Sequence, residues 1–146
     1  MDLEIWRDAI DLATKLFDLA DKLTKKGLYR FAEQLRGSGL SMSNNIAEGS
    51  GSSSKREFSN FLNIARRSTF ENANVILILE KCGLLGEPEA TEILIALDRL
   101  SGKLQTFRRL SGASRMRRTF YSMPLAPSSL SSFALHYALR PMRFAR

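Results

Sequence analysis

Residues 41–57 read "SMSNNIAEGSGSSSKRE", and this stretch decides how the chain folds. An apolar spacing typical of a helix runs up to Glu48, and the Gly/Ser run at 49–53 interrupts it. Ser54 and Glu57 then fit a capping box, in which two side chains satisfy free amide groups at a helix start. Because the interruption is short, we expect two neighbouring antiparallel helices joined by a turn.

The segment "GSGSSSK" at 49–55 also has some likeness to a phosphate-binding loop. The Walker pattern needs a second glycine directly before the lysine and a strand before the loop. Here Ser54 precedes Lys55, and the flanking segments have helical spacing. We therefore interpret the segment as a helix–helix turn that ends in a cap.

Residues 3–26 are predicted to form the first helix, because two apolar rows recur at three-to-four spacing. The rows are Ile5, Ala9, Leu12, Leu16, Leu19 and Leu23, and beside them Trp6, Ile10, Ala13, Phe17 and Ala20. Such a wide apolar face exceeds what one bundle core needs and favours a subunit interface. On the polar side of this helix, an acidic residue stands four positions before a basic one three times, which predicts an exposed helical face. The three pairs are Asp11/Lys15, Asp18/Lys22 and Asp21/Lys25.

Three further helices are predicted over residues 29–49, 55–82 and 88–110. Their apolar rows include Phe31, Leu35, Met42 and Ile46, then Phe58, Phe61, Leu62, Ala65, Asn72, Ile76 and Leu79, then Ile93, Leu97, Leu100, Leu104 and Phe107. Gly27 and Gly83 are stop signals, and Pro88 suits a first helical turn. Glycines inside the second helix, Gly37 and Gly39, suggest that another backbone comes close.

Four helices with short connections and no strand pattern predict an all-α fold, an antiparallel up-down-up-down four-helix bundle. We assign residues 1–110 to this bundle. Residues 111–146 differ in composition, since they contain Ser, Pro and Arg without a sustained helical period. We interpret them as a basic, largely irregular C-terminal tail.

The formal net charge of +7 belongs almost entirely to that tail. Residues 111–146 contain six arginines and no acidic residue, so the bundle is close to neutral. The arginines Arg115, Arg117, Arg118, Arg140, Arg143 and Arg146 alternate with aromatic residues. Such a tail can track phosphates and stack on bases, lie on an anionic membrane, or do neither. Arg66 and Arg67 make a basic edge on the third helix, which is either a solvated face or a further nucleic-acid contact.

Residue types for catalysis or metal binding are scarce. The only histidine, His136, lies in the tail, and Cys82 is the only cysteine. A di-iron bundle needs Glu-x-x-His on facing helices, and a zinc site needs several ligands. Glu48 and Glu71 lack a second acid beside them, so acid–base catalysis is weakly supported. We expect no enzyme activity, no cofactor, no metal and no small-molecule substrate.

A stripe of polar side chains follows the second helix beside its apolar row. Its members, at spacings of four and three residues, are Gln34, Ser38, Ser41, Asn45 and Glu48. We predict that Asn45 and Glu48 are largely buried and hydrogen-bonded, with Ser68, Arg36 or a neighbouring subunit as partner. An unsatisfied partner there would cost about 1–3 kcal/mol.

The stretch "QLRGSGLSMSNNIAEGSGSSSKREFSNFLNIARRS" at 34–68 resembles the signature of the bacterial "four helix bundle protein" family. That family was first noticed as products of intervening sequences in 23S ribosomal RNA genes. The likeness covers about residues 3–110, and its polar positions are Gln34, Arg36, Ser41, Asn45, Glu48, Gly49, Ser68 and Glu71. The resemblance implies a bundle that assembles as a ring, typically a homopentamer, without a known enzyme activity.

Two functions follow as hypotheses. The first is a non-enzymatic helical module that self-assembles and presents surfaces to a partner. The alternative rests on a distant relative of the same architecture, the accessory protein of diversity-generating retroelements, which binds RNA and a reverse transcriptase. The N-terminus "MDLEIWRD" is acidic and unlike a signal peptide, and the longest apolar run is too short for a bilayer. We expect a cytoplasmic protein with no membrane partner.

Overall fold

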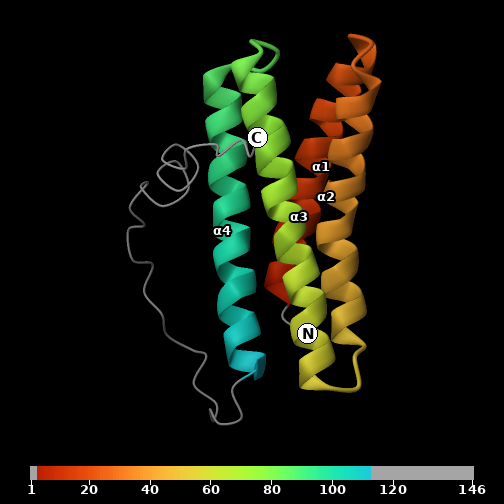
Figure 1. The fold of residues 1–146 in the computed structure, drawn as a ribbon, viewed down its shortest axis with the longest axis vertical. Coiled ribbons are helices and arrows are strands. Elements are labelled where there is room, and N and C mark those ends of the chain that lie inside the picture. The colour runs from red at the N-terminus through yellow and green to blue at the C-terminus, as the bar shows by residue number, and fades with distance from the viewer. Residues whose placement is uncertain (1–2, 113–146) are drawn as a thin grey trace, which may run out of the picture. The chain divides into compact units, whose positions relative to one another are not determined.

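A computed structural model describes residues 3–112 of the chain, and these residues form four α-helices. The helices are α1 (Leu3–Lys25), α2 (Tyr29–Ser50), α3 (Lys55–Lys81) and α4 (Glu87–Gly112). They run side by side and alternate in direction, with the α2–α3 turn at one end and the other two turns at the opposite end (Figure 1). The predicted all-α four-helix fold is confirmed, and the predicted helix ends differ from the observed ones by one or two residues.

Glycine ends two of the helices, as predicted. Gly27 and Gly83 have φ values of 76° and 68°, the left-handed region that glycine adopts without a steric penalty. After each glycine the chain bonds back to the helix, from the Leu28 amide to the Leu23 carbonyl at 3.0 Å and from the Leu84 amide to the Leu79 carbonyl at 2.9 Å. These two bonds satisfy carbonyls that a helix end otherwise leaves free.

The cap before α3 is confirmed in its main part. The Ser54 hydroxyl accepts a hydrogen bond from the Glu57 amide at 3.2 Å. The Glu57 carboxylate lies 3.5 Å from the Ser53 hydroxyl, one residue earlier than a capping box places it. The Gly/Ser segment is therefore a turn with a capped exit, as the sequence indicated.

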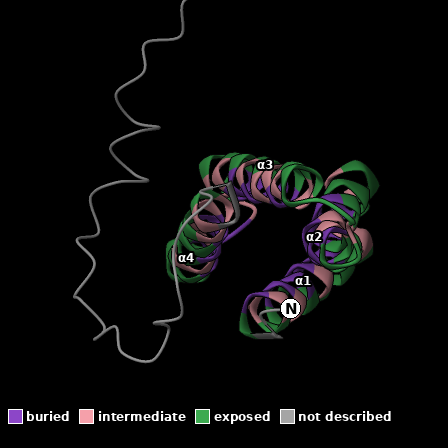
Figure 2. Cartoon of the chain, turned by 90° about the horizontal axis from the view of Figure 1, so that it is seen from below, coloured by how far each residue is buried: buried purple, intermediate pink, exposed green. Residues whose placement is uncertain are grey.

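The helices follow one another around an arc in the order α1, α2, α3, α4, with their buried faces inward (Figure 2). Neighbours in sequence pack along their lengths, whereas α1 and α4 touch at fewer places. The core contains most of the predicted apolar rows, whereas their aromatic members and Ile10 are half-buried. Its largest fully buried apolar side chains are Leu16, Leu23, Leu35, Met42, Leu62, Ile76, Leu79, Leu97, Leu100 and Leu104. Burial of each such side chain contributes roughly 1.5–3 kcal/mol.

Part of the second apolar row of α1 packs against α2 of the same chain. Ala13 and Ala20 are buried, and a Cβ atom placed on Gly39 of α2 would lie 3.4 Å from the Phe17 ring and 3.8 Å from the Ala13 Cα. The close approach predicted at Gly39 is therefore confirmed. The prediction is wrong for Gly37, which is exposed and has no atom within 4 Å of such a Cβ, because it faces solvent.

Candidate functional site

The polar residues of the sequence signature meet between α2 and α3. Four side-chain hydrogen bonds cross from one helix to the other, and the weakest runs from Asn72 Nδ2 to Met42 Sδ at 3.9 Å. The Gln34 amide donates to the Glu71 carboxylate, the Ser38 hydroxyl donates to Asn72 Oδ1 at 2.8 Å, and the Ser68 hydroxyl donates to Ser41 Oγ at 2.9 Å. We call this group, with Asn45, the polar seam: Gln34, Ser38, Ser41, Asn45, Ser68, Glu71 and Asn72.

Asn72 is the innermost residue of the polar seam, because it has no exposed surface. Its Nδ2 donates to the Ser68 carbonyl at 2.8 Å, and its Oδ1 accepts from Ser38. A buried amide without such partners would be costly, so these bonds fix the register of α3 against α2. Sequence reasoning placed Asn72 in the apolar row of its helix. An asparagine in that row was the available signal for a buried polar contact.

The lower end of this interface is closed by a glycine. A Cβ atom on Gly49 would lie 2.8 Å from the Phe58 ring and 2.9 Å from the Phe61 Cβ, closer than carbon atoms pack. Only a residue without a side chain therefore fits between α2 and the two phenylalanines. Gly49, a residue of the signature, sets the distance between the two helices.

Within a single chain, Glu48 is not buried as predicted, and Asn45 is buried only in part. Glu48 is exposed, whereas the adjacent Gly49 is buried against Phe58 and Phe61. Asn45 is half-buried, and its Nδ2 donates within its own helix, to the Ser41 carbonyl at 2.8 Å and to Ser41 Oγ at 3.1 Å. Neither side chain reaches Arg36 or bonds to Ser68 directly.

Arg36 and the two helix-three arginines lie away from the polar seam. Arg36 points to α1, where its Nη2 pairs with Asp21 at 2.5 Å and reaches the Thr24 hydroxyl at 3.2 Å. The Arg66 guanidinium lies 4.9 Å from the centre of the Phe70 ring, a cation–π contact. Arg67 is exposed. The predicted tail residues Arg115, Arg117, Arg118, Arg140, Arg143 and Arg146 lie outside the described residues.

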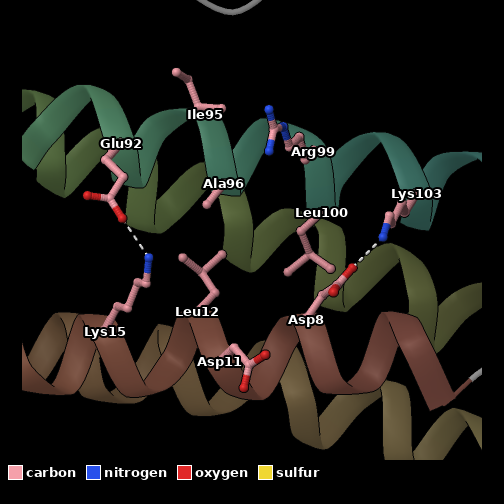
Figure 3. Close-up of a pocket in the computed structure, with 10 residues that line it drawn as sticks. All are labelled: Asp8, Asp11, Leu12, Lys15, Glu92, Ile95, Ala96, Arg99, Leu100 and Lys103. Carbon is pink, nitrogen blue, oxygen red and sulfur yellow. Dashed lines mark hydrogen bonds and ion pairs between the residues drawn. The ribbon is translucent and has the colours of Figure 1, made fainter. Parts of the chain in front are cut away.

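A groove of about 400 Å³ separates α1 from α4. Leu12, Ala96 and Leu100 lie in its middle, and ion pairs bridge it on either side (Figure 3). Lys15 pairs with Glu92 at 2.6 Å, and Lys103 pairs with Asp8 at 2.6 Å and with Glu4 at 2.7 Å. Lys22 and Glu89 pair at 2.8 Å nearer the start of α4.

These ion pairs change the titration of their members. The hydrogen bond and charge of Lys15 lower the pKa of Glu92, and those of Lys103 lower the pKa of Glu4. The hydrogen bond of Glu89 raises the pKa of Lys22. Partial burial lowers the pKa of Lys103, but its bonds to Asp8 and Glu4 outweigh this effect, so its pKa is raised overall.

The exposed face predicted from the i,i+4 pairs of α1 is confirmed, because all six of their residues are exposed. Within this face, Lys15 and Lys22 form their ion pairs with carboxylates of α4. Each lysine bonds to α4 because α4 carries a carboxylate, Glu92 or Glu89, at the same height along the bundle. Local i,i+4 spacing could not show this.

The chain matches a family model described as "23S rRNA-intervening sequence protein" over residues 1–106. That match covers most of the chain and includes every residue of the polar seam. The chain belongs to this family. The resemblance seen in the signature at 34–68 is thereby confirmed.

A solved structure has the same fold. A crystal structure of a protein from Bacteroides thetaiotaomicron VPI-5482, described as a protein with unknown function from the S23 ribosomal protein family, superposes with a TM-score of 0.70. The two sequences are 20% identical, and the match covers 72% of this chain and 98% of the other. No curated protein matches the chain.

For this member of the 23S rRNA-intervening sequence protein family, two groups of side-chain contacts stand out among the described residues: the polar seam and the ion pairs along the α1–α4 groove. Within residues 3–112, no three His, Cys, Asp or Glu side chains cluster as a metal site. None of the four helices described is long and apolar enough to cross a membrane. The side chains of the polar seam hydrogen-bond to one another, and these bonds hold α2 and α3 in position.

Proposed function

We propose that the chain is a non-enzymatic helical module that self-assembles and serves as a scaffold or binding surface. One observation carries this proposal. The large apolar side chains that are most exposed among the described residues all lie on α2 or α3: Tyr29 (63%), Leu40 (49%), Ile64 (43%) and Ile78 (39%). Exposed apolar side chains gathered on one side of a molecule are typical of interaction sites.

The spacing of these side chains supports a shared surface. Tyr29 and Leu40 are eleven residues apart, close to three helical turns, and Ile64 and Ile78 are fourteen apart, close to four. Each pair therefore lies along one line of its helix. Leu40 directly precedes Ser41, and Ile64 lies one turn before Ser68, so both flank a hydrogen bond of the polar seam. The seam holds α2 and α3 in a fixed register and so presents these side chains as a rigid surface.

The assembly that we propose is a homopentameric ring, a number that comes from the family resemblance. In a ring, one surface of each copy contacts a different surface of the next copy. The outer side of α2 and α3 supplies one of these surfaces in the proposal. Glu48, exposed at the end of α2, lies on the same helix and is available to a neighbouring copy.

Sedimentation velocity of the full chain tests this proposal. Leu40→Lys and Ile64→Lys place a charge on the proposed surface, and each is expected to shift the chain toward its monomer mass. Thr91→Lys is the matched control, because it adds the same side chain at an exposed position of α4. Unchanged sedimentation of both the leucine and the isoleucine variant, with folding intact by circular dichroism, would overturn the proposal.

RNA binding is the second candidate function, alone or beside a reverse transcriptase as in the distant relative. The observation that favours it is the Arg66–Phe70 contact beside the exposed Arg67, together with six arginines and no acid in residues 111–146. Arginine and aromatic side chains bind single strands through phosphates and stacked bases.

Fluorescence anisotropy with a labelled single-stranded RNA tests the second candidate. The full chain is compared with two variants, one with Arg66→Gln and Arg67→Gln and one with the six tail arginines changed to glutamine. Binding that weakens steeply with salt and is lost in the second variant supports a tail contact. Absence of binding by the unmodified chain at low salt would contradict RNA binding.

A further inference from the structure

Two neighbouring segments of α3 and α4, at one end of the bundle, contain positive charges alone. Residues 58–70 of α3 and 99–112 of α4 include six Arg or Lys residues and no Asp or Glu. The two segments lie side by side, because α3 begins and α4 ends at the same end of the bundle (Figure 1). At the other end of this helix pair, residues 78–92 contain four glutamates and one lysine. An anionic partner is therefore attracted to the first end and repelled from the second.

Arg66, in the first of these segments, is half-buried and has no acidic partner among the described residues. Its Nε is buried and has no hydrogen-bond partner within residues 3–112. The guanidinium lies over the Phe70 ring, 4.9 Å from its centre. A charged N–H group that is withdrawn from water is costly unless an acceptor lies beside it. Arg66 is therefore prepared for an acceptor that the described part of the chain does not supply.

A second arginine lies next to Arg66 across the α3–α4 interface. Arg108 Nη1 donates a hydrogen bond to Asn63 Oδ1 at 2.7 Å, and Asn63 stands one turn before Arg66. On the antiparallel α4, the residue one turn before Arg108 is Gln105, which therefore lies level with Arg66. The two arginines are thus about one helical turn apart, roughly 5.4 Å along the bundle. We call Asn63, Arg66, Phe70, Gln105 and Arg108 the arginine cluster.

We propose that the arginine cluster binds the backbone of single-stranded RNA, with Arg66 and Arg108 as phosphate contacts. This inference rests on the second candidate function, RNA binding, and assigns a contact to the bundle itself. A guanidinium presents its N–H groups in a planar fork that matches a phosphate group, and two guanidiniums one turn apart offer two such forks. RNA bases stack on guanidinium planes as well as on aromatic rings.

The amide of Gln105 favours RNA over an acidic protein as the partner. Gln105 Oε1 is buried and has no hydrogen-bond donor within the described part of the chain. The residue as a whole is half-buried, so rotation of its amide group brings this oxygen to a ligand. Ribose 2′-hydroxyls and base amino groups supply donors, whereas a carboxylate supplies acceptors alone. RNA therefore satisfies both the arginines and the glutamine of the cluster.

Fluorescence anisotropy of a labelled single-stranded RNA, measured over a range of salt concentrations, tests the inference on the full chain. Arg66→Gln with Arg108→Gln removes both phosphate contacts. This double variant is expected to weaken binding by about tenfold or more and to reduce the salt slope by roughly one to two. The matched control is Arg7→Gln with Arg30→Gln, the same loss of charge at exposed positions of α1 and α2. The control is expected to bind RNA nearly as the unmodified chain does.

Asn63 is a positioning residue for Arg108, and its removal separates geometry from charge. A guanidinium that is fixed before binding loses less conformational freedom when a phosphate binds. Asn63→Ala is therefore expected to weaken RNA binding by roughly threefold or more with an unchanged salt slope. Asn60→Ala, at an exposed position of the same helix, is the control and is expected to have no effect. Circular dichroism checks that each variant is folded.

Three results would overturn the inference. One is equal RNA binding by the double arginine variant and its control. Another is complete loss of binding when only the six tail arginines are changed to glutamine, which places the RNA contact in the tail and leaves the second candidate function standing. The third is a glutamate-rich peptide that displaces the RNA at equal charge concentration, which makes an acidic protein the partner. If the unmodified chain binds no RNA at low salt, the second candidate function falls with this inference, and the proposed self-assembly is unaffected.

Discussion

Most side chains that join α2 to α3 are short, neutral and shielded, the exposed Gln34–Glu71 pair excepted, whereas those that bridge the α1–α4 groove are long, charged and mostly exposed. At the first contact, Ser38, Ser41, Ser68 and Asn72 bond directly, and Gly49 lets the helices approach closely. At the second, ion pairs span a groove. Buried hydrogen bonds fix one geometry, while exposed ion pairs contribute little to stability. The bundle is therefore firmly joined on one side and weakly joined on the other.

The largest effect is expected where the helices approach most closely. Gly49→Leu would push a side chain into Phe58 and Phe61, and we expect it to lower the free energy of unfolding by about 3 kcal/mol or more. Gly37→Leu is the control in the same helix, where nothing obstructs the new side chain. Urea denaturation measures both. Equal losses for the two variants would mean that Gly49 does not set the helix spacing.

The next effect concerns the buried amide of the polar seam. Asn72→Ala removes the acceptor for Ser38 and leaves a small void, so we expect a loss of about 2 kcal/mol. Asn74→Ala, at an exposed position two residues further along α3, is expected to change stability little. The same urea experiment measures the difference. If Asn74→Ala lowered the free energy of unfolding as much as Asn72→Ala, burial of the Asn72 amide would not explain its effect.

A smaller effect is expected on the weakly joined side. Lys103→Gln removes the cation shared by Asp8 and Glu4, and it is expected to destabilise the chain less than Asn72→Ala does. The effect should vanish near 1 M salt, where the screening length falls to about 3 Å. Lys81→Gln, at the exposed end of α3, is the control. A Lys103 effect that is independent of salt would show that its packing, and not its charge, matters.

The smallest effect is the pH dependence of the α1–α4 ion pairs. The pKa values of Glu4 and Glu92 are lowered by lysine, so their contribution is complete at neutral pH and is lost as the pH falls through the lowered values. The pKa values of Lys22 and Lys103 are raised, so their contribution is lost only as the pH rises through the raised values. Hydrogen-exchange protection factors, which remove the intrinsic pH dependence of amide exchange, should therefore fall in α1 and α4 before α2 and α3 at both extremes. A uniform fall along all four helices would contradict this comparison.

Sequence periodicity was sufficient for the fold and for part of the polar seam. The apolar rows, Gly27, Gly83 and the Ser54 cap are local signals, and the structure confirms them. The common face of Gln34, Ser41 and Asn45 was also readable from spacing. Their partners depend on how two helices align, which spacing within one helix does not contain. For that reason Asn72 was placed with the apolar residues and Glu48 was predicted to be buried.

The groove was not foreseen for a related reason. The i,i+4 spacing of Asp11 and Lys15 indicated an exposed helical face, but Lys15 bonds across to Glu92. Which helices are neighbours in space, and at which level, follows only from the assembled bundle. Once those levels are known, the opposite charges that pair across α1 and α4 can be recognised.

Native mass spectrometry of the full chain, over a range of concentrations, tests the central claim of self-assembly most directly. We predict species at multiples of the 16.4 kDa chain mass, with the pentamer dominant at micromolar concentration. Only the single-chain mass at every concentration would contradict self-assembly, and the exposed side chains of α2 and α3 would then need a partner other than a second copy.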